Sequence, residues 1–291
     1  MRLATIKLLG MEIAAIITEK GAVPVSLVSE RLNKNWSRDL FEIIEKGQLD
    51  EMKDWYENGG KKEIEKLEFI PKEKVKYGPL YRRPRKIWGI GLNYVEHASD
   101  LAEKAPDEEP ASFMKPDTAI IGHKDAIKIP VQSEKTTAES ELGVIIGKVC
   151  KEVEREDWLS YVAGFTTVID VTAEDILRKN PRYLTRAKSF DTFFSFGPVL
   201  VTPDEIEDVL KLRVATVKNG EIYAQNTVSN MKFPPDFLVS FHSKVMTLLP
   251  GDIISTGTPR AVQINDGDTV ECWIDGFEPL INNVIDLKAR K

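Results

Sequence analysis

Short apolar segments separated by turn residues run through most of the chain, and their spacing predicts a mainly β protein with short helices, an α+β fold. Near the start, apolar runs predict three strands of a small meander, at 4–9, 13–18 and 23–27. Ser37 is the expected N-cap of a helix, because apolar residues follow it at helical spacing until Gly47. A second, more polar helix is expected from Leu49 to Gly60.

The longer second part alternates apolar strands with short amphipathic helices. Strands are predicted at 87–91, 142–146, 162–170, 195–202, 212–217 and in the alternating tail from 252 onward. Helices are predicted at 95–104, 155–161, 172–179 and 237–246. Asn219-Gly220 lies between two alternating runs and predicts a tight hairpin. Pro79 and Pro84, with arginines around them, mark the expected boundary between a small N-terminal domain, residues 1–80, and a second domain, residues 85–291.

Composition narrows the class of protein. The 291 residues carry a net charge of −6, which gives no attraction to phosphate backbones or anionic lipid, so we expect no nucleic-acid partner. No apolar run approaches the roughly 18 residues that a membrane helix needs, and the start lacks a signal peptide, so no membrane association is expected and the predicted location is cytoplasmic. Cys150 and Cys272 are far apart and show no metal-ligand spacing, which predicts two reduced thiols.

Three carboxylates suggest a metal site. Glu139 and Glu141 stand two positions apart at the start of an apolar strand, so they share one face about 7 Å apart. Like charges entering a core need a cation or a proton, and Asp170, at the end of a second apolar run, is a third oxygen donor. Such a set suits Mg²⁺ or Mn²⁺, with Ca²⁺ also possible. Alternatively, the two glutamates lie on a solvated strand face and Asp170 caps the helix that follows it.

Three further segments could carry chemistry, and each has a simpler alternative. His97 and Asp100 are three residues apart on a predicted helix, where a carboxylate can orient an imidazole as a general base. An exposed surface pair is the alternative. Lys188 could place its ammonium on a developing oxyanion, or be an ordinary surface lysine. The segment 255–259 could bring glycine backbone and hydroxyls against a ligand, or form only a tight turn.

Taken together and in this order, six segments of the second part resemble the fumarylacetoacetate hydrolase family. They are Gly91-Leu92-Asn93-Tyr94 with His97, Phe113-Met114-Lys115-Pro116, Glu139-Ser140-Glu141-Leu142, Asp170-Val171-Thr172-Ala173, Ala187-Lys188-Ser189-Phe190-Asp191, and Pro250 through Pro259. The resemblance covers roughly residues 85–291. It implies a mixed β-sandwich roll with a small N-terminal α/β domain, a homodimer, and a divalent metal held by Glu139, Glu141 and Asp170.

The resemblance also implies a class of reaction. Family members act on small 2-oxo acids, acylpyruvates and diketo acids by hydrolysis, decarboxylation or isomerisation. Transferred to this chain, the substrate-binding residues would be Lys115, Gly257 and Thr258, and the catalytic residues Lys188 and His97 paired with Asp100. We therefore predict C–C bond cleavage through a metal-stabilised enolate, on an acylpyruvate, fumarylpyruvate or oxaloacetate-like substrate. An isomerase of 2-hydroxyhepta-2,4-diene-1,7-dioate is the second hypothesis, and a non-catalytic metal- or metabolite-binding relative is the third.

Three departures from the family pattern bear on this prediction. Asp100 stands where relatives have Glu, which shortens the partner of His97 by one methylene. Glu174 stands where many members have an Arg expected to bind a substrate carboxylate, so another arginine would have to substitute: Arg178, Arg182 or Arg186. The loop at 260–263 is shorter than usual and lacks glycines. This short loop resembles the bifunctional isomerase/decarboxylase branch of homoprotocatechuate breakdown, a route of aromatic compound catabolism.

Overall fold

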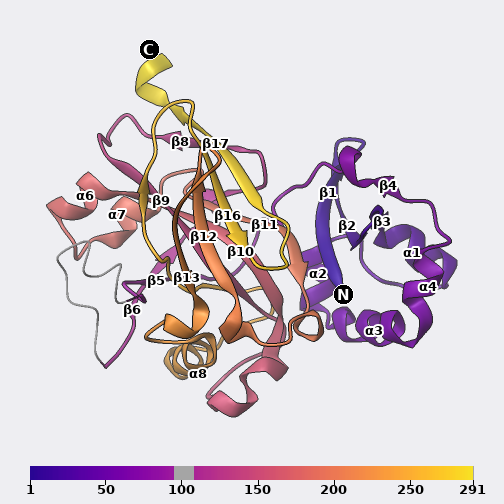
Figure 1. The fold of residues 1–291 in the computed structure, drawn as a ribbon. Helices are drawn as coiled ribbons and strands as arrows, with labels where there is room; N and C mark the ends of the chain where they lie inside the picture. Colours follow the sequence, from indigo (N-terminus) through magenta and orange to yellow (C-terminus); the bar gives the residue numbers. More distant parts are fainter. Residues whose placement is uncertain (95–107, 291) are drawn as a thin grey trace.

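The computed structural model describes residues 1–94 and 108–290, and their fold is mainly β, as predicted (Figure 1). A 12-stranded sheet has the order β4-β3-β2-β1-β11-β10-β9-β14-β5-β6, with β7 paired to β11 and β15 to β9. Its strands are β1 (Arg2–Leu8), β2 (Met11–Thr18), β3 (Gly21–Pro24), β4 (Ile70–Pro71), β5 (Ile87–Gly91), β6 (Ala111–Lys115), β7 (Ile120–Ile121), β9 (Thr136–Ile146), β10 (Val162–Ala173), β11 (Phe194–Val201), β14 (Ile253–Ser255) and β15 (Val262–Gln263).

A second sheet of five strands completes the β structure, in the order β13-β12-β16-β17-β8. Its strands are β8 (Ala126–Ile129), β12 (Arg213–Lys218), β13 (Glu221–Thr227), β16 (Thr269–Ile274) and β17 (Leu280–Asp286). Apolar side chains from both sheets share one buried cluster, which includes Leu142 and Phe165 of the large sheet and Val214 and Val270 of the small one. The core of the second part therefore lies between the two sheets.

The helices of the described residues are short and lie around the sheets (Figure 1). They are α1 (Val25–Arg31), α2 (Leu40–Glu45), α3 (Gln48–Trp55), α4 (Lys61–Ile64), α6 (Glu174–Lys179), α7 (Leu184–Lys188) and α8 (Pro235–Val245), with a π-helical turn at Tyr56–Gly60. Short 3₁₀ turns lie at Lys72–Lys74, Asp117–Ala119, Arg155–Tyr161, Pro203–Glu205, Val209–Lys211, Val228–Asn230 and Leu287–Arg290. No helix of the described residues is long and apolar enough to cross a membrane.

Two local predictions in the N-terminal part were wrong. The strand expected through Leu27 ends at Pro24, and α1 begins at Val25, because Val25 and Val28 bury their side chains on one helix face. The N-cap of α2 is Asp39, whose carboxylate accepts the Glu42 N–H at 3.1 Å. Ser37 instead donates its hydroxyl to the Glu42 side chain at 2.8 Å. The second error arises because two residues that commonly cap helices, Ser37 and Asp39, stand two positions apart.

The central strand pair β9 and β10 is longer than predicted. β9 begins at Thr136, and β10 continues through Thr172, which the sequence had placed in a helix. Thr172 is opposite Thr137 and Ala173 is opposite Thr136, so cross-strand pairing keeps Thr172 and Ala173 extended. The strand β6, which was not among the predicted strands, is likewise held by pairing with β5. The helix predicted at 95–104 lies outside the described residues.

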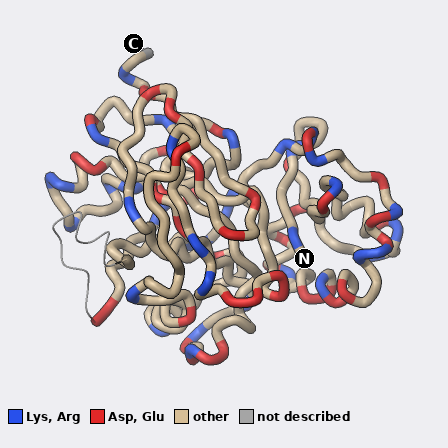
Figure 2. The backbone as a smooth tube through the Cα atoms, viewed as in Figure 1, with Lys and Arg blue, Asp and Glu red and all other residues tan. Residues whose placement is uncertain are grey.

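The N-terminal strands join the same large sheet as the second part. Figure 1 shows the N-terminal residues as a separate group of elements beside the larger β structure, connected through β1. Arg2 of β1 is opposite Val201 of β11, in an antiparallel pair. Basic and acidic residues are interspersed over both parts (Figure 2).

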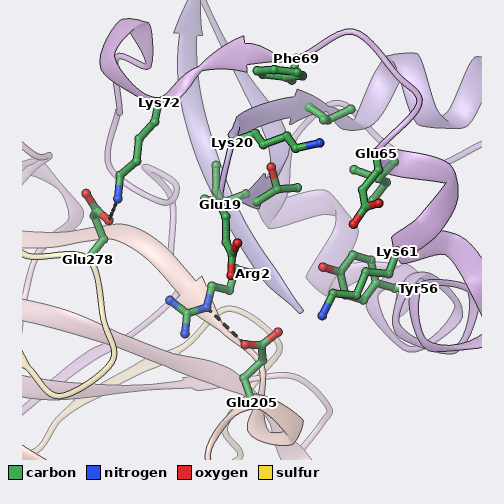
Figure 3. A pocket seen from close by; sticks show the side chains of 14 residues that line it. Arg2, Glu19, Lys20, Tyr56, Lys61, Glu65, Phe69, Lys72, Glu205 and Glu278 are labelled. Atoms are coloured by element: carbon green, nitrogen blue, oxygen red, sulfur yellow. Dashed lines mark hydrogen bonds and ion pairs between the residues drawn. The ribbon is translucent and has the colours of Figure 1, made fainter.

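A cavity of about 590 Å³ lies at the boundary between the two parts, here called the seam, where residues 2–72 meet Glu205 and Glu278 (Figure 3). Two ion pairs beside it cross the seam: Arg2 Nε lies 3.3 Å from Glu205 Oε2, and Lys72 Nζ lies 3.2 Å from Glu278 Oε2. None of the site residues predicted from the sequence lines this cavity.

Candidate metal centre

The three carboxylates predicted as metal ligands converge on β9 and β10. Asp170 is directly opposite Glu139 in the antiparallel register, and Glu141 lies two residues further along the same face of β9. One carboxylate oxygen from each of the three residues lies within 4.8 Å of the others. Glu141 and Asp170 are buried, at 1% and 0% exposed, whereas Glu139 is partly exposed.

Two buried lysines complete the cluster. Lys188, the last residue of α7, places Nζ 3.0 Å from Glu139 Oε2 and 2.7 Å from Asp170 Oδ2. Lys115, the last residue of β6, donates to Asp170 Oδ1 and to the Val171 carbonyl at 3.2 Å. With all five groups ionised, the cluster carries one net negative charge, which a divalent cation would convert to one positive charge.

The loop after β14 holds Glu141. Ser255 Oγ donates to Glu141 Oε2 at 2.5 Å, and the Gly257 N–H donates to the same oxygen at 2.8 Å. On β10, Thr172 Oγ1 donates to Glu139 Oε1 at 2.9 Å. These contacts fix the orientation of two predicted metal ligands, as hydrogen bonds to metal-binding carboxylates commonly do.

Burial and charge set the protonation of the cluster. Burial, followed by the charges of Asp170 and Glu139, raises the pKa of Glu141 to about 8, so this carboxyl holds a proton at neutral pH. Burial also acts to raise the pKa of Asp170, but Lys115 and Lys188 outweigh it, and that pKa is lowered. Asp170 is therefore ionised, and a divalent cation would take the place of the proton on Glu141.

The pKa values of the two lysines are shifted in opposite directions. Burial lowers the pKa of Lys115 to about 8, with the neighbouring Lys188 charge adding to the effect and Asp170 opposing it. For Lys188, burial acts in the same direction, but Asp170 and Glu139 outweigh it and raise the pKa. Lys188 is thus a permanent cation of the cluster, whereas Lys115 can lose its proton near neutral pH.

Gly257 is required by close packing. Its φ of +97° is unfavourable for other residues, and an added Cβ would lie 2.8 Å from Asn93 Cβ and 3.1 Å from the Ile90 carbonyl oxygen. Asn93 itself is fully buried and donates from Nδ2 to the Thr256 and Phe233 carbonyls, at 2.7 and 2.9 Å. Thr258 is buried, and its hydroxyl donates to the Arg260 carbonyl at 3.3 Å.

The structure describes the three candidate arginines but not the predicted His97–Asp100 pair. His97 and Asp100 lie outside the described residues. Arg178, one of the arginines considered for anion recognition, donates from Nε and Nη2 to Glu174 Oε1, at 2.9 and 2.5 Å. Arg182 and Arg186 are exposed.

Several contributors to the centre were not singled out from the sequence. Thr172, Ser255 and Asn93 lie inside motifs that were noted, but nothing in their spacing showed which carboxylate or loop each would hold. The contact of Lys115 with Asp170 likewise joins segments 55 positions apart.

The residues present fit a divalent cation. Carboxylate oxygens are hard donors, and three of them from two strands lie close enough together to share one ion. Two of these carboxylates are oriented by neighbouring hydroxyl and backbone N–H groups. Such a donor set suits a hard, oxygen-preferring divalent cation rather than a thiolate-preferring metal.

Comparison with known proteins shows which family this chain resembles. A model of the fumarylacetoacetate (FAA) hydrolase C-terminal domain matches residues 86–285. The mitochondrial oxaloacetate tautomerase of Rattus norvegicus is 36% identical over 227 residues, 75% of this chain and 72% of that protein.

Solved structures similar to this chain include two enzymes. The 5-carboxymethyl-2-hydroxymuconate delta-isomerase from Mycobacterium smegmatis has a TM-score of 0.76 at 30% identity, covering 98% of this chain and 99% of its own. Maleylpyruvate hydrolase from Sphingobium sp. SYK-6, in complex with manganese (II) ion and pyruvate, has a TM-score of 0.80 at 25% identity, covering 98% and 99%.

Proposed function

This chain belongs to the fumarylacetoacetate hydrolase family, and we propose that it is a divalent-metal-dependent enzyme that interconverts keto and enol forms of a small 2-oxo acid. The observation that carries the proposal is the buried cluster of three carboxylates and two lysines on β9, β10, β6 and α7. A tautomerase and an isomerase among the similar proteins support proton relocation as the reaction.

Glu139, Glu141 and Asp170 would hold Mg²⁺ or Mn²⁺. When bound, such an ion supplies Lewis-acid chemistry, drawing electron density from the 2-oxo group and so easing removal of a proton from the adjacent carbon. Ser255 and the Gly257 N–H keep Glu141 oriented towards this position. The burial of Glu141 and Asp170 strengthens these electrostatic effects, because it limits screening by water.

The two lysines would bind the oxygens of the substrate. Lys188 stays charged and is placed to hold an enolate or carboxylate oxygen beside Glu139. Lys115, with a pKa of about 8, can hold a second oxygen or return a proton to it. We further propose Thr258 as a contact for the substrate carboxylate. His97, supported by Asp100, is the proposed acceptor of the proton from carbon.

One experiment tests the reaction. The protein, with Mg²⁺ or Mn²⁺, is incubated with oxaloacetate, acetylpyruvate, fumarylpyruvate and 2-hydroxyhepta-2,4-diene-1,7-dioate, while enol absorbance, carboxylic acid release and CO₂ are followed separately. We expect a metal-dependent change in enol absorbance with neither a new acid nor CO₂. We expect Glu141→Ala to abolish both Mn²⁺ binding and turnover, and Glu221→Ala, at an exposed position on β13, to change neither. Undiminished turnover in a chelator, or in Glu141→Ala, would refute the proposal.

C–C bond cleavage is the second candidate, and similarity to maleylpyruvate hydrolase favours it. The same assay separates the two reactions. Release of one carboxylic acid per enol consumed would assign hydrolysis, and CO₂ without a new acid would assign decarboxylation.

A further inference from the structure

The ammonium group of Lys188 is enclosed by two carboxylates and one aromatic ring. Its Nζ hydrogen-bonds Glu139 and Asp170, and it also lies 4.7 Å from the centroid of the Phe113 ring. An ammonium within about 6 Å of a ring face is attracted by the negative charge density of that face. The side chain of Lys188 is only 7% exposed, so water competes little with this attraction.

The Phe113 ring is held in place by the strand beside it. Phe113 on β6 is opposite Gly89 on β5. A Cβ at Gly89 would lie 2.2 to 2.9 Å from three atoms of the Phe113 ring, so the ring packs directly on the glycine backbone. Phe113 is 8% exposed. The position of the ring is therefore fixed, because Gly89 has no side chain and leaves the space that the ring fills.

The ring differs from the other two contacts of Lys188 in one respect. Glu139 and Asp170 are the proposed ligands of the cation, and their attraction for Lys188 would weaken if a metal ion shared their negative charge. Lysine has a flexible four-carbon stem that does not hold its ammonium in one place without such contacts. The attraction to Phe113 does not depend on the carboxylates, so it persists in both states.

We propose that Phe113 is a positioning residue for Lys188. The ring keeps the ammonium beside Glu139, the most exposed of the three carboxylates, where a substrate oxygen would bind. This inference deepens the proposed function and rests on it for its kinetic consequence, although the contact between the ring and the ammonium can be tested without any reaction.

The test distinguishes two effects of the ring on Lys188, the attraction of its π face for the ammonium and its packing volume. Replacing Phe113 with pentafluorophenylalanine keeps the approximate shape and removes the attraction to a cation, whereas Phe113→Leu removes the ring altogether. Pentafluorophenylalanine at Phe41, which packs on Tyr81 in the N-terminal part, is the matched control. In the metal-free protein, lysines are methylated with formaldehyde and dimethylamine-borane and quantified by peptide mass spectrometry, with exposed Lys128 as the internal reference.

We expect both changes at Phe113 to speed methylation of Lys188 relative to Lys128 by about 3- to 30-fold, the range that a cation–π contact supports. In the Mn²⁺-loaded protein we expect a loss of about the same size in kcat/KM, with the Kd for Mn²⁺ unchanged. The Phe41 control should match the unmodified protein in both assays.

Two results would overturn the proposal. If pentafluorophenylalanine at Phe113 leaves Lys188 methylation unchanged while Phe113→Leu speeds it, the ring acts only through packing. If neither change affects Lys188, the ring does not position it. Failure of the proposed function is distinguishable, because a protein with no turnover on any 2-oxo acid would still give the methylation result.

Discussion

The crowding around Gly257 gives a quantitative prediction for alanine substitution. Alanine there would suffer backbone strain and a steric clash, and a second glycine allows the two costs to be measured separately. Gly257 has a φ of +97° and an added Cβ would meet Asn93 Cβ at 2.8 Å. Gly267 has a similar φ of +81°, is exposed, and has no atom within 4 Å of an added Cβ. Alanine at Gly267 therefore suffers only the backbone strain, whereas alanine at Gly257 suffers the strain and a steric clash.

The expected sizes follow from these contacts. A left-handed backbone costs a non-glycine residue roughly 1–2 kcal/mol. Forcing an extra methyl into a packed site costs roughly 1–3 kcal/mol more. Asn93 cannot move aside cheaply, because its side chain is buried and bonded to the Thr256 and Phe233 carbonyls. We expect Gly267→Ala to lower the free energy of unfolding by roughly 1–2 kcal/mol and Gly257→Ala by roughly 2–5 kcal/mol.

Two measurements check this prediction. Urea denaturation of the metal-free proteins gives the free energies of unfolding, and electron paramagnetic resonance of free Mn²⁺ gives the metal affinity. Because the Gly257 N–H and Ser255 hold Glu141, a displaced loop should weaken the affinity for Mn²⁺ by about 10- to 100-fold in Gly257→Ala alone. Equal destabilisation of the two variants, or an unchanged Mn²⁺ affinity in Gly257→Ala, would refute the reasoning.

Two further predictions concern charge. Lys188→Met should destabilise the metal-free protein by about 3–5 kcal/mol, since it removes the ion pair of Glu139 and leaves Asp170 paired with Lys115 alone. Adding Mn²⁺ should recover part of the lost melting temperature in differential scanning calorimetry. Burial, reinforced by Lys124, lowers the pKa of His123 from 6.5 to about 4, so its neutral form is favoured in the folded protein. Unfolding therefore favours protonation of His123 between pH 6.5 and 4. Its contribution to the free energy of unfolding is complete above pH 6.5 and falls by at most about 3 kcal/mol as the pH drops towards 4. Urea denaturation at pH 7, 5.5 and 4 should show a weaker pH dependence in His123→Leu, and an identical dependence would contradict the assignment.

Local patterns in the sequence were enough to predict much of the secondary structure. Alternation of side chains along a strand placed Glu139 and Glu141 on one face without any knowledge of neighbouring strands. Asn219 and Gly220 both adopt left-handed backbone, with φ of 52° and 82°, in the predicted hairpin between β12 and β13. The helix α8 and the strand β5 also lie where their apolar spacing indicated. Each of these features depends on residues only a few positions apart.

The arrangement of the centre depended on the tertiary structure. Asp170 faces Glu139 because β9 and β10 pair in one particular antiparallel register, and a shift by one residue would turn Asp170 to the other face. Lys115 and Lys188 reach the same carboxylate from β6 and α7, and Glu174 binds Arg178, an arginine considered for anion recognition. Side-chain periodicity is a property of neighbouring residues, so the sequence alone could single out the three candidate carboxylates. Strand register and the approach of Lys115 and Lys188 are decided by packing between segments far apart in the chain, so only the tertiary structure determines what surrounds those carboxylates.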